Sequence, residues 1–283
     1  MELIDFHTHV YPDRIAGPTV RYLAASGGIS PAGGTGTVGD LEGVAERAGV
    51  SLAVNLPIAT RPEQAASINR FARELNLRGG RVMSFGAIHP DAEEPERELE
   101  ELAKAGFRGI KLHPDYQGHY VDDPSVIRVV REAKRLGLHT VFHGGVDIAF
   151  PDDVHATPRR VYRLLSALGE GDGQVIVAHV GGYRLYDEVE ETLVGQDVYF
   201  DLSYGIDDLP PEQLTRIIRR HGADRILFGS DYPWRDPADV DRALSALPLT
   251  EEQFYLIRSG NARRLLGLSG GAETSSPHGR PEE

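Results

Sequence analysis

The chain has 283 residues, with 43 acidic and 30 basic side chains and a formal net charge of -13. It contains no cysteine, which excludes disulfides, thiolate zinc fingers and cysteine nucleophiles, so any bound metal must have nitrogen and oxygen ligands. The acidic balance disfavours nucleic acid and anionic membranes as partners. No run approaches the ~20 apolar residues of a membrane span, and the first residues lack the basic start of a signal peptide. We therefore expect a cytoplasmic protein.

Eight short apolar runs recur along the chain, and most are followed by an amphipathic helical pattern. Near-continuous apolar runs are typical of strands that are covered on both faces, as in a parallel sheet. The predicted strands span residues 3–10, 51–58, 81–90, 107–114, 139–145, 174–182, 198–204 and 225–233. Helices are predicted over 62–77, 94–106, 124–137, 158–169 and 210–222. Several of these helices open with proline and close on glycine, as helices commonly do.

This alternation predicts an α/β fold of the (β/α)₈ or TIM barrel type, with residues 1–268 forming one catalytic domain. A doubly wound open sheet is the alternative, but it usually carries a GxGxxG turn after the first strand, and none follows Val10. The glycine-rich segment 26–39 lacks the GK[ST] end of a phosphate loop and is interpreted as a mobile loop between the first strand and its helix. Residues 269–283 are polar, which predicts a disordered tail.

Polar residues interrupt the apolar runs mainly at their carboxyl ends. Because side chains alternate along a strand, His7 and His9 share one face, and Lys111 and His113 share another. In a parallel barrel all carboxyl ends open on the same mouth, so residues from distant runs become neighbours. The other polar residues at these ends are His143, His179, Asp201 and Asp231.

Four imidazoles and one carboxylate are costly to bury at one mouth unless something pairs them, and a divalent cation does so directly. A nitrogen-rich set with a single carboxylate favours Zn²⁺, with Mn²⁺ as the alternative, and leaves open one or two ions. A bound cation lowers the pKa of its water toward ~7, which supplies a nucleophile at neutral pH. A lone strand histidine is more often structural, so the prediction depends on the whole set. The predicted metal ligands are His7, His9, His143, His179 and Asp231.

The chain resembles the amidohydrolase superfamily, and more closely its amidohydrolase-related branch, which includes carboxymuconate-semialdehyde decarboxylase-like enzymes. Five ordered motifs carry the resemblance over about residues 2–268: IDFHTHVYP, FRGIKLHP, VIVAHVGG, ILFGSDYPW and GNARRLLGL. The resemblance implies a (β/α)₈ barrel with His7, His9, His143 and Asp231 on a metal. It also implies that His179 is a further ligand or polarises substrate or water, and that Asp231 accepts the proton of the attacking water.

Lys111 is a third candidate catalytic residue, since the chain has only the lysines Lys104, Lys111 and Lys134 and one of them ends the fourth run. In parts of the superfamily a carboxylated lysine at this place bridges two metals, a role that arginine cannot take. The alternative, which we favour, keeps Lys111 cationic and paired with Asp201, Asp231 or a substrate carboxylate. The decarboxylase-like branch usually works with one metal and no such lysine.

The leading functional hypothesis is a metal-dependent hydrolase that cleaves an amide, lactone or ester-like bond of a small polar substrate. Asp231 would take the proton of water, and His179 or Lys111 would stabilise the oxyanion. The alternative is a lyase, either a decarboxylase or a hydratase, acting on a small carboxylic acid. Lys111 and Arg235 suit a carboxylate-bearing substrate in either class.

Two further hypotheses remain. A TatD-type deoxyribonuclease is less favoured, because that family has a glutamate in the fourth-strand motif, where this chain has GIKLHP, and because the chain is acidic. A non-enzymatic scaffold would bind no metal through His7 and His9. The sequence is compatible with a homo-oligomer but does not predict one.

Overall fold

The computed structural model describes residues 1–31, 34–169 and 174–268. The strands pair in parallel, each with the next in sequence, from β1 to β3 and from β4 to β9. They are β1 (Leu3–Thr8), β2 (Val50–Asn55), β3 (Val82–Ser84), β4 (Gly86–Ala87), β5 (Gly109–Leu112), β6 (His139–Phe142), β7 (Val175–Val177), β8 (Tyr199–Asp201) and β9 (Ile226–Leu227).

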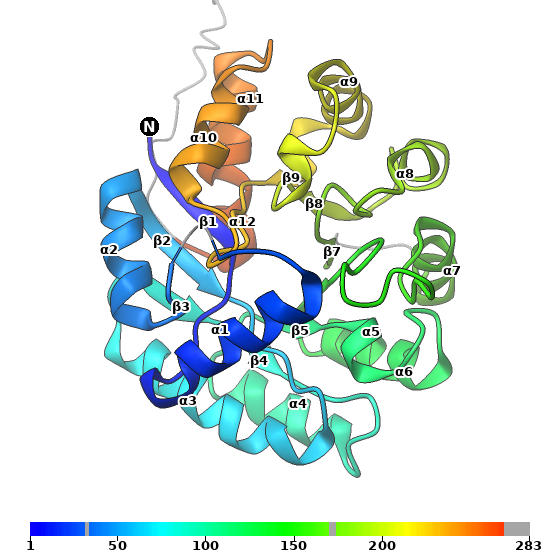
Figure 1. Ribbon diagram of the computed structural model, residues 1–283. Helices are drawn as coiled ribbons and strands as arrows, with labels where there is room; N and C mark the ends of the chain where they lie inside the picture. The colour runs from blue at the N-terminus through cyan, green and yellow to red at the C-terminus, as the bar shows by residue number, and fades with distance from the viewer. Residues whose placement is uncertain (32–33, 170–173, 269–283) are drawn as a thin grey trace, which may run out of the picture.

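Backbone hydrogen bonds join the two sheets into a closed ring. The amide of Phe85 donates to the carbonyl of Asn55 at 2.9 Å, so β3 and β4 together form the third position of the barrel. At the other seam, the amide of Phe6 donates to Phe228 at 2.9 Å and the amide of Asp231 donates to His7 at 2.8 Å. The eight predicted runs therefore occupy eight barrel positions, with the helices around them (Figure 1), and the predicted (β/α)₈ barrel is confirmed.

The helices form the outer layer of the barrel (Figure 1). Those predicted from the sequence are present with ends that differ by a few residues, and the one predicted over 62–77 begins as a 3₁₀ turn at Pro62–Gln64. The helices are α1 (Asp13–Gly27), α2 (Val38–Ala48), α3 (Ala65–Arg78), α4 (Pro95–Lys104), α5 (Pro114–Gln117), α6 (Pro124–Arg135), α7 (Pro158–Leu168), α8 (Tyr186–Thr192), α9 (Pro211–His221), α10 (Pro237–Ser245), α11 (Glu251–Tyr255) and α12 (Asn261–Leu266). No helix among the described residues is long and apolar enough to cross a membrane.

Two asparagines of α3 explain why the third strand is interrupted. The side chain of Asn76 accepts a hydrogen bond from the amide of Ser84 at 2.7 Å and donates to its carbonyl at 2.9 Å. Asn69 makes the same pair of bonds with the backbone of Ala87, at 2.7 and 2.8 Å. Side chains thus satisfy buried backbone groups at the break in the strand.

The prediction for the glycine-rich segment 26–39 was wrong in its position. Helix α1 directly follows the first strand, so the segment lies between α1 and α2 and its ends belong to those helices. The interior Pro18 disfavours a helix in this stretch of sequence, but burial of Ala16 and Val20 offsets that cost. Residues 32–33 of this segment and the predicted tail, 269–283, lie outside the described residues.

A buried apolar cluster draws residues from strands far apart in the sequence, and Phe6 and Phe85 meet edge to face within it with ring centroids 5.6 Å apart. In each strand, the residue of this cluster lies closer to the amino end than the polar residue that faces the mouth. This apolar layer therefore fills the barrel beneath the polar mouth, as the layered interior of such barrels requires. The strand residues are Ile4, Phe6, Val54, Val141, Ile176, Tyr199 and Leu227.

Candidate metal centre and active site

The structure brings the predicted site residues together at the carboxyl ends of the strands. The place of each residue follows from the local strand geometry, because the chain turns outward at the end of a parallel strand and a polar side chain there can face the mouth. All of them except His9 are buried. The residues are His7 in β1, His9 after it, Lys111 in β5, His143 after β6, His179 after β7, Asp201 in β8 and Asp231 after β9.

Three of these residues converge on a single point. Nε2 of His7 and Nε2 of His9 are 3.2 Å apart, and Oδ1 of Asp231 lies 3.5 Å from the first and 3.2 Å from the second. These spacings are those of ligand atoms that share one ion. We call these three residues the His7 cluster.

Hydrogen bonds on the far side of each ring define which nitrogen carries the proton. Nδ1 of His7 lies 2.8 Å from Oδ2 of Asp201, and Nδ1 of His9 lies 2.9 Å from the carbonyl of Leu56. Both partners can only accept, so each Nδ1 donates and each Nε2 keeps its lone pair. Two lone pairs and the carboxylate of Asp231 therefore face one another. A divalent cation fits this donor set, because three acceptors in contact otherwise repel.

His143 and His179 lie beside the His7 cluster. Nε2 of His179 is 3.0 Å from Nδ1 of His143, and the rings of His179 and His7 stack with centroids 5.3 Å apart. Nδ1 of His179 lies 3.0 Å from the carbonyl of Ser203, which fixes Nδ1 as the donor. The placement of both histidines at the mouth agrees with the sequence, while their role as ligands stays a prediction.

Burial and mutual charge set the ionisation of the cluster. Burial, assisted by the charge of Lys111, lowers the pKa of His7 to about 4, so this ring is neutral and available as a ligand. Burial raises the pKa of Asp231, but the interactions with His7 and His9 outweigh it and hold the pKa below its usual value. Burial likewise opposes ionisation of Asp201, and the interactions with His7 and His179 lower its pKa overall.

Lys111 is a buried cation that has no hydrogen-bond partner among the described residues. The side chain is 1 % exposed. Burial lowers its pKa to about 8, against the opposing charges of Asp201 and Asp231. The expected pairing with one of these two aspartates is therefore not made as a direct contact among the described residues. An unpaired buried ammonium group is costly, and a bound anion would offset that cost.

Asp5 and Ser230 form hydrogen bonds beneath the His7 cluster, on the side away from the mouth. Asp5 accepts hydrogen bonds from the amides of His7 and Ser230 at 3.2 and 2.9 Å and from the hydroxyl of Ser230 at 2.5 Å. Burial raises the pKa of Asp5 to about 7. The carboxyl thus fixes the backbone of the two strands that carry His7 and Asp231, and it does not touch either imidazole of the His7 cluster.

Ser203 was not singled out from the sequence. Its hydroxyl lies 3.0 Å from Nδ1 of His7 and 2.9 Å from Nδ1 of His179, and it also bonds to Asp201. The sequence did contain one signal for Ser203. It lies two residues after Asp201, and in an extended segment this spacing places both side chains on the same face.

Strained backbone marks the same rim. His179 and Asp231 have φ angles of 61° and 64°, in the left-handed region that residues other than glycine rarely adopt. Such strain persists where the surrounding structure imposes it, commonly at functional sites. Arg235, the other cation predicted at the mouth, pairs with Asp207 at 3.1 Å and is 35 % exposed.

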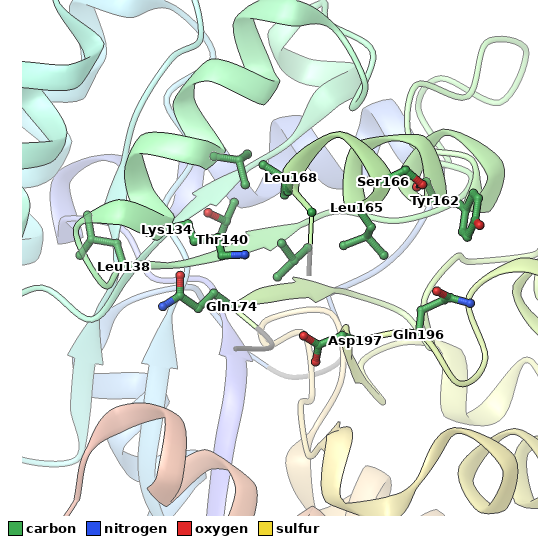
Figure 2. A pocket seen from close by; sticks show the side chains of 13 residues that line it. Lys134, Leu138, Thr140, Tyr162, Leu165, Ser166, Leu168, Gln174, Gln196 and Asp197 are labelled. Atoms are coloured by element: carbon green, nitrogen blue, oxygen red, sulfur yellow. The ribbon is translucent and has the colours of Figure 1, made fainter. Parts of the chain in front are cut away.

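A separate cavity of about 350 Å³ lies at the opposite end of the barrel (Figure 2). It is lined by residues of helices α6 and α7, such as Lys134 and Leu165, and by residues at or near the amino ends of β6, β7 and β8, including Thr140, Gln174 and Asp197. Gly169 and Gln174 flank residues that are outside the described part of the chain. We assign no role to this cavity.

Comparison with known proteins now fixes the family. The family model described as amidohydrolase matches residues 4–268. The chain belongs to the amidohydrolase family. The protein is therefore an enzyme of a metal-dependent family, and the resemblance seen in its motifs is confirmed. A search of curated proteins finds no match.

Solved structures of this fold are similar along nearly the whole chain. A 2,6-dihydroxybenzoate decarboxylase from Rhizobium has 18% identity and a TM-score of 0.68, covering 95% of this chain and 100% of that one. A manganese-containing 5-carboxyvanillate decarboxylase from Novosphingobium aromaticivorans has 16% identity and a TM-score of 0.68, covering 94% and 97%. A candidate 2-pyrone-4,6-dicarboxylic acid hydrolase from Pseudomonas putida has 19% identity and a TM-score of 0.65, covering 95% and 98%. At these identities the likeness establishes the fold.

Proposed function

We propose that the protein is a metal-dependent hydrolase that cleaves a lactone, ester-like or amide bond in a small carboxylate-bearing substrate. The observation that carries this proposal is the convergence of Nε2 of His7, Nε2 of His9 and Oδ1 of Asp231 within 3.5 Å. Three acceptors with no donor between them match the ligand set of a transition-metal ion. Zinc is the expected ion, and manganese is the second to test, since one similar structure contains it.

The bound ion would polarise the scissile carbonyl and lower the pKa of water. Asp231 would accept the proton of the attacking water and pass it to the leaving oxygen or nitrogen as the bond to the carbonyl carbon breaks. The ring of His179 stacks on that of His7 and would help to position the substrate. Proton transfer by positioned groups of this kind commonly contributes ~10²–10⁴-fold to the rate.

Lys111 is the reason to propose a carboxylate-bearing substrate. Its ammonium group is buried at the mouth and makes no hydrogen bond to a described residue. A substrate carboxylate would supply the missing partner, and a charge-assisted hydrogen bond of this kind is among the stronger polar contacts. In the hydrolase this contact would hold the substrate with its reactive carbonyl over the His7 cluster.

A decarboxylase is the second candidate, and the same lysine favours it. A carboxylate held between Lys111 and the ion would be the group that leaves as carbon dioxide, with a proton taking its place on the substrate. Two of the similar structures are decarboxylases of aromatic acids. The two candidates share every residue of the centre and differ in the bond that breaks.

An assay of the products separates the candidates. Protein loaded with Zn²⁺ or Mn²⁺ is tested against lactones of polycarboxylic acids and against hydroxylated benzoic acids, with acid release and carbon dioxide release measured in parallel. Acid release from lactones supports the hydrolase, and carbon dioxide release from benzoates supports the decarboxylase. No turnover of either set by protein that holds its metal would contradict both candidates. The cytoplasmic location stays a prediction.

A further inference from the structure

Tyr232 connects the His7 cluster with a helix outside the barrel. Its hydroxyl donates a hydrogen bond to Oδ2 of Asp40 in α2 at 2.9 Å and accepts one from the amide of Gly36 at 3.3 Å. Tyr232 is fully buried, and α2 belongs to the outer layer of the fold (Figure 1). The tyrosine therefore reaches from the turn that carries Asp231, the residue before it, to the outer layer.

The backbone around Tyr232 holds two members of the His7 cluster. The carbonyl of Tyr232 accepts the amide of His9 at 2.7 Å, and its own amide donates to the hydroxyl of Ser230 at 3.0 Å. One residue earlier, the amide of Asp231 donates to the carbonyl of His7 at 2.8 Å. A displacement of Tyr232 would therefore shift Asp231 directly and His9 through a hydrogen bond.

Asp231 depends on such a restraint because its backbone is strained. Its φ angle of 64° lies in the left-handed region, which costs free energy for a residue that has a Cβ atom. A conformation of this kind persists where the surrounding structure imposes it. The carboxylate of Asp231 nevertheless lies 3.2 Å from Nε2 of His9 and 3.5 Å from Nε2 of His7. A loosened turn would move the carboxylate away from these two nitrogens.

Asp40, the partner of Tyr232, is itself fixed in place. Its Oδ2 also accepts the amide of Thr35 at 2.6 Å, and its own amide donates to the hydroxyl of Thr37, which caps α2, at 3.2 Å. Burial opposes the ionisation of Asp40, but the hydrogen bonds from Thr35 and Tyr232 lower its pKa overall. The hydroxyl of Tyr232 thus donates to an anion, and such bonds are stronger than those between neutral groups. The backbone closes tightly here, since a Cβ atom at Gly34 would lie 2.5 Å from that hydroxyl.

We propose that Tyr232 and Asp40 position Asp231 for metal binding, through the hydrogen bond that joins them. The proposal rests on the proposed function, because it takes the His7 cluster to be a metal centre. Neither side chain makes a hydrogen bond to the cluster among the described residues, so both act through the backbone of Asp231. Packing alone would require only the ring of Tyr232, which phenylalanine would fill as well. The hydroxyl, bonded to an anion of the outer layer, is the part that packing does not explain.

Tyr199 offers a matched control. It is also buried, and its hydroxyl accepts a hydrogen bond from the guanidinium group of Arg264 at 2.8 Å. Tyr199 begins β8, so it lies at the opposite end of the barrel from the His7 cluster. Tyr199→Phe therefore removes a hydrogen bond between a buried tyrosine and a charged group, as Tyr232→Phe does, but far from the cluster. If Tyr232 were purely structural, both variants would lose stability and neither would lose metal affinity.

The test measures zinc affinity and stability separately. Chelator-stripped proteins are titrated with Zn²⁺ against a chromophoric chelator, and urea unfolding gives the stability of each metal-free protein. We expect Tyr232→Phe and Asp40→Ala each to lower zinc affinity about 10-fold, the low end of the ~10–100-fold range for residues that orient ligands. Asp40→Asn should keep most of the affinity, because its amide oxygen still accepts the hydroxyl of Tyr232. Tyr199→Phe should lose stability and keep the wild-type affinity.

A double variant tests the link between the two residues. If they act through their hydrogen bond, Tyr232→Phe combined with Asp40→Ala should lose about 10-fold in total, and not the ~100-fold of two independent effects. Wild-type affinity in Tyr232→Phe, or losses that multiply in the double variant, would overturn this inference and leave the zinc centre intact. A wild type that binds neither Zn²⁺ nor Mn²⁺ would contradict the proposed function and this inference together. If Tyr232→Phe does not fold, Asp40→Ala and its rescue by Asp40→Asn decide.

Discussion

Asp201 accepts a hydrogen bond from Nδ1 of His7 at 2.8 Å while its other oxygen accepts the backbone amides of His179 and Ser203, each at 3.0 Å. One carboxylate thus orients the ring of His7 and holds the strained turn that carries His179. The sequence places these residues at the ends of three strands but does not show this connection, since the hydrogen bonds depend on the exact rotation of each ring.

Asp201→Asn tests this orienting role. The amide keeps the size of the side chain but removes the charge that favours a proton on Nδ1 of His7. Loss of a carboxylate behind a ligand histidine commonly lowers metal affinity ~10–100-fold, and we expect a decrease in that range. Zinc affinity is measured by competition with a chromophoric chelator, with the exposed Asp224→Asn as control. Unchanged affinity in Asp201→Asn would show that Asp201 acts only in folding.

His9→Ala distinguishes an enzyme's metal centre from a chance cluster of histidines. We expect loss of the ion of the His7 cluster and of activity together, because two ligands rarely retain an ion that three hold. His9 is the least buried ligand, so the fold should tolerate the change. Elemental analysis and circular dichroism check both points, with His155→Ala as the control. A variant that keeps its full metal content would contradict the centre as described.

Lys111→Met separates function from stability. The substitution preserves the apolar stem and removes an ammonium group that has no hydrogen-bond partner among the described residues. We expect the free energy of unfolding to stay the same or rise, since the cost of burying the charge disappears. We expect kcat/KM on a carboxylate substrate to fall ~10–100-fold, the usual worth of a hydrogen bond to a charged group.

Urea unfolding and steady-state kinetics measure the two effects of Lys111→Met. Lys111→Arg is the companion variant, because it keeps the charge but cannot be carboxylated. Activity in Lys111→Arg with loss in Lys111→Met would support a cationic role. A variant Lys111→Met with full activity would remove the lysine from the site.

The fold was predictable because its signals are local. Each strand is a short apolar run, and each polar residue of the site ends such a run, so the topology of a parallel barrel brings them together without further information. Helix α1 was missed because Gly17 and Pro18 disfavour a helix locally, and only tertiary burial of Ala16 and Val20 favours it.

The detail of the site was less predictable, for a physical reason. Asp147 lies four residues after His143 in a loop, where no regular spacing indicates which way a side chain points. Its approach to His113 depends on the loop's own hydrogen bonds, such as that from Ala149. The sequence could therefore indicate which residues reach the mouth, while the contacts among them required the structure.

A buried histidine outside the site gives the stability of the protein a pH dependence. His221 is 1 % exposed, its Nδ1 accepts the amide of Gly195 at 3.1 Å, and its Nε2 donates to the carbonyl of Val198 at 2.8 Å. Burial lowers its pKa from 6.5 to about 4, although the bond to Val198 opposes the shift. Both ring nitrogens are thus engaged in the neutral form.

The direction of the effect follows from proton binding. As the pH falls below 6.5 the unfolded chain binds a proton at His221 and the folded protein does not, so the free energy of unfolding decreases until the pH reaches about 4. Between pH 7.5 and pH 5 this residue should cost about 2 kcal/mol, from ~1.4 kcal/mol per pH unit. His221→Gln should lose that part of the pH dependence, while His155→Gln should retain it. Urea unfolding at the two pH values measures the difference, and equal slopes in the wild type and His221→Gln would contradict the assignment.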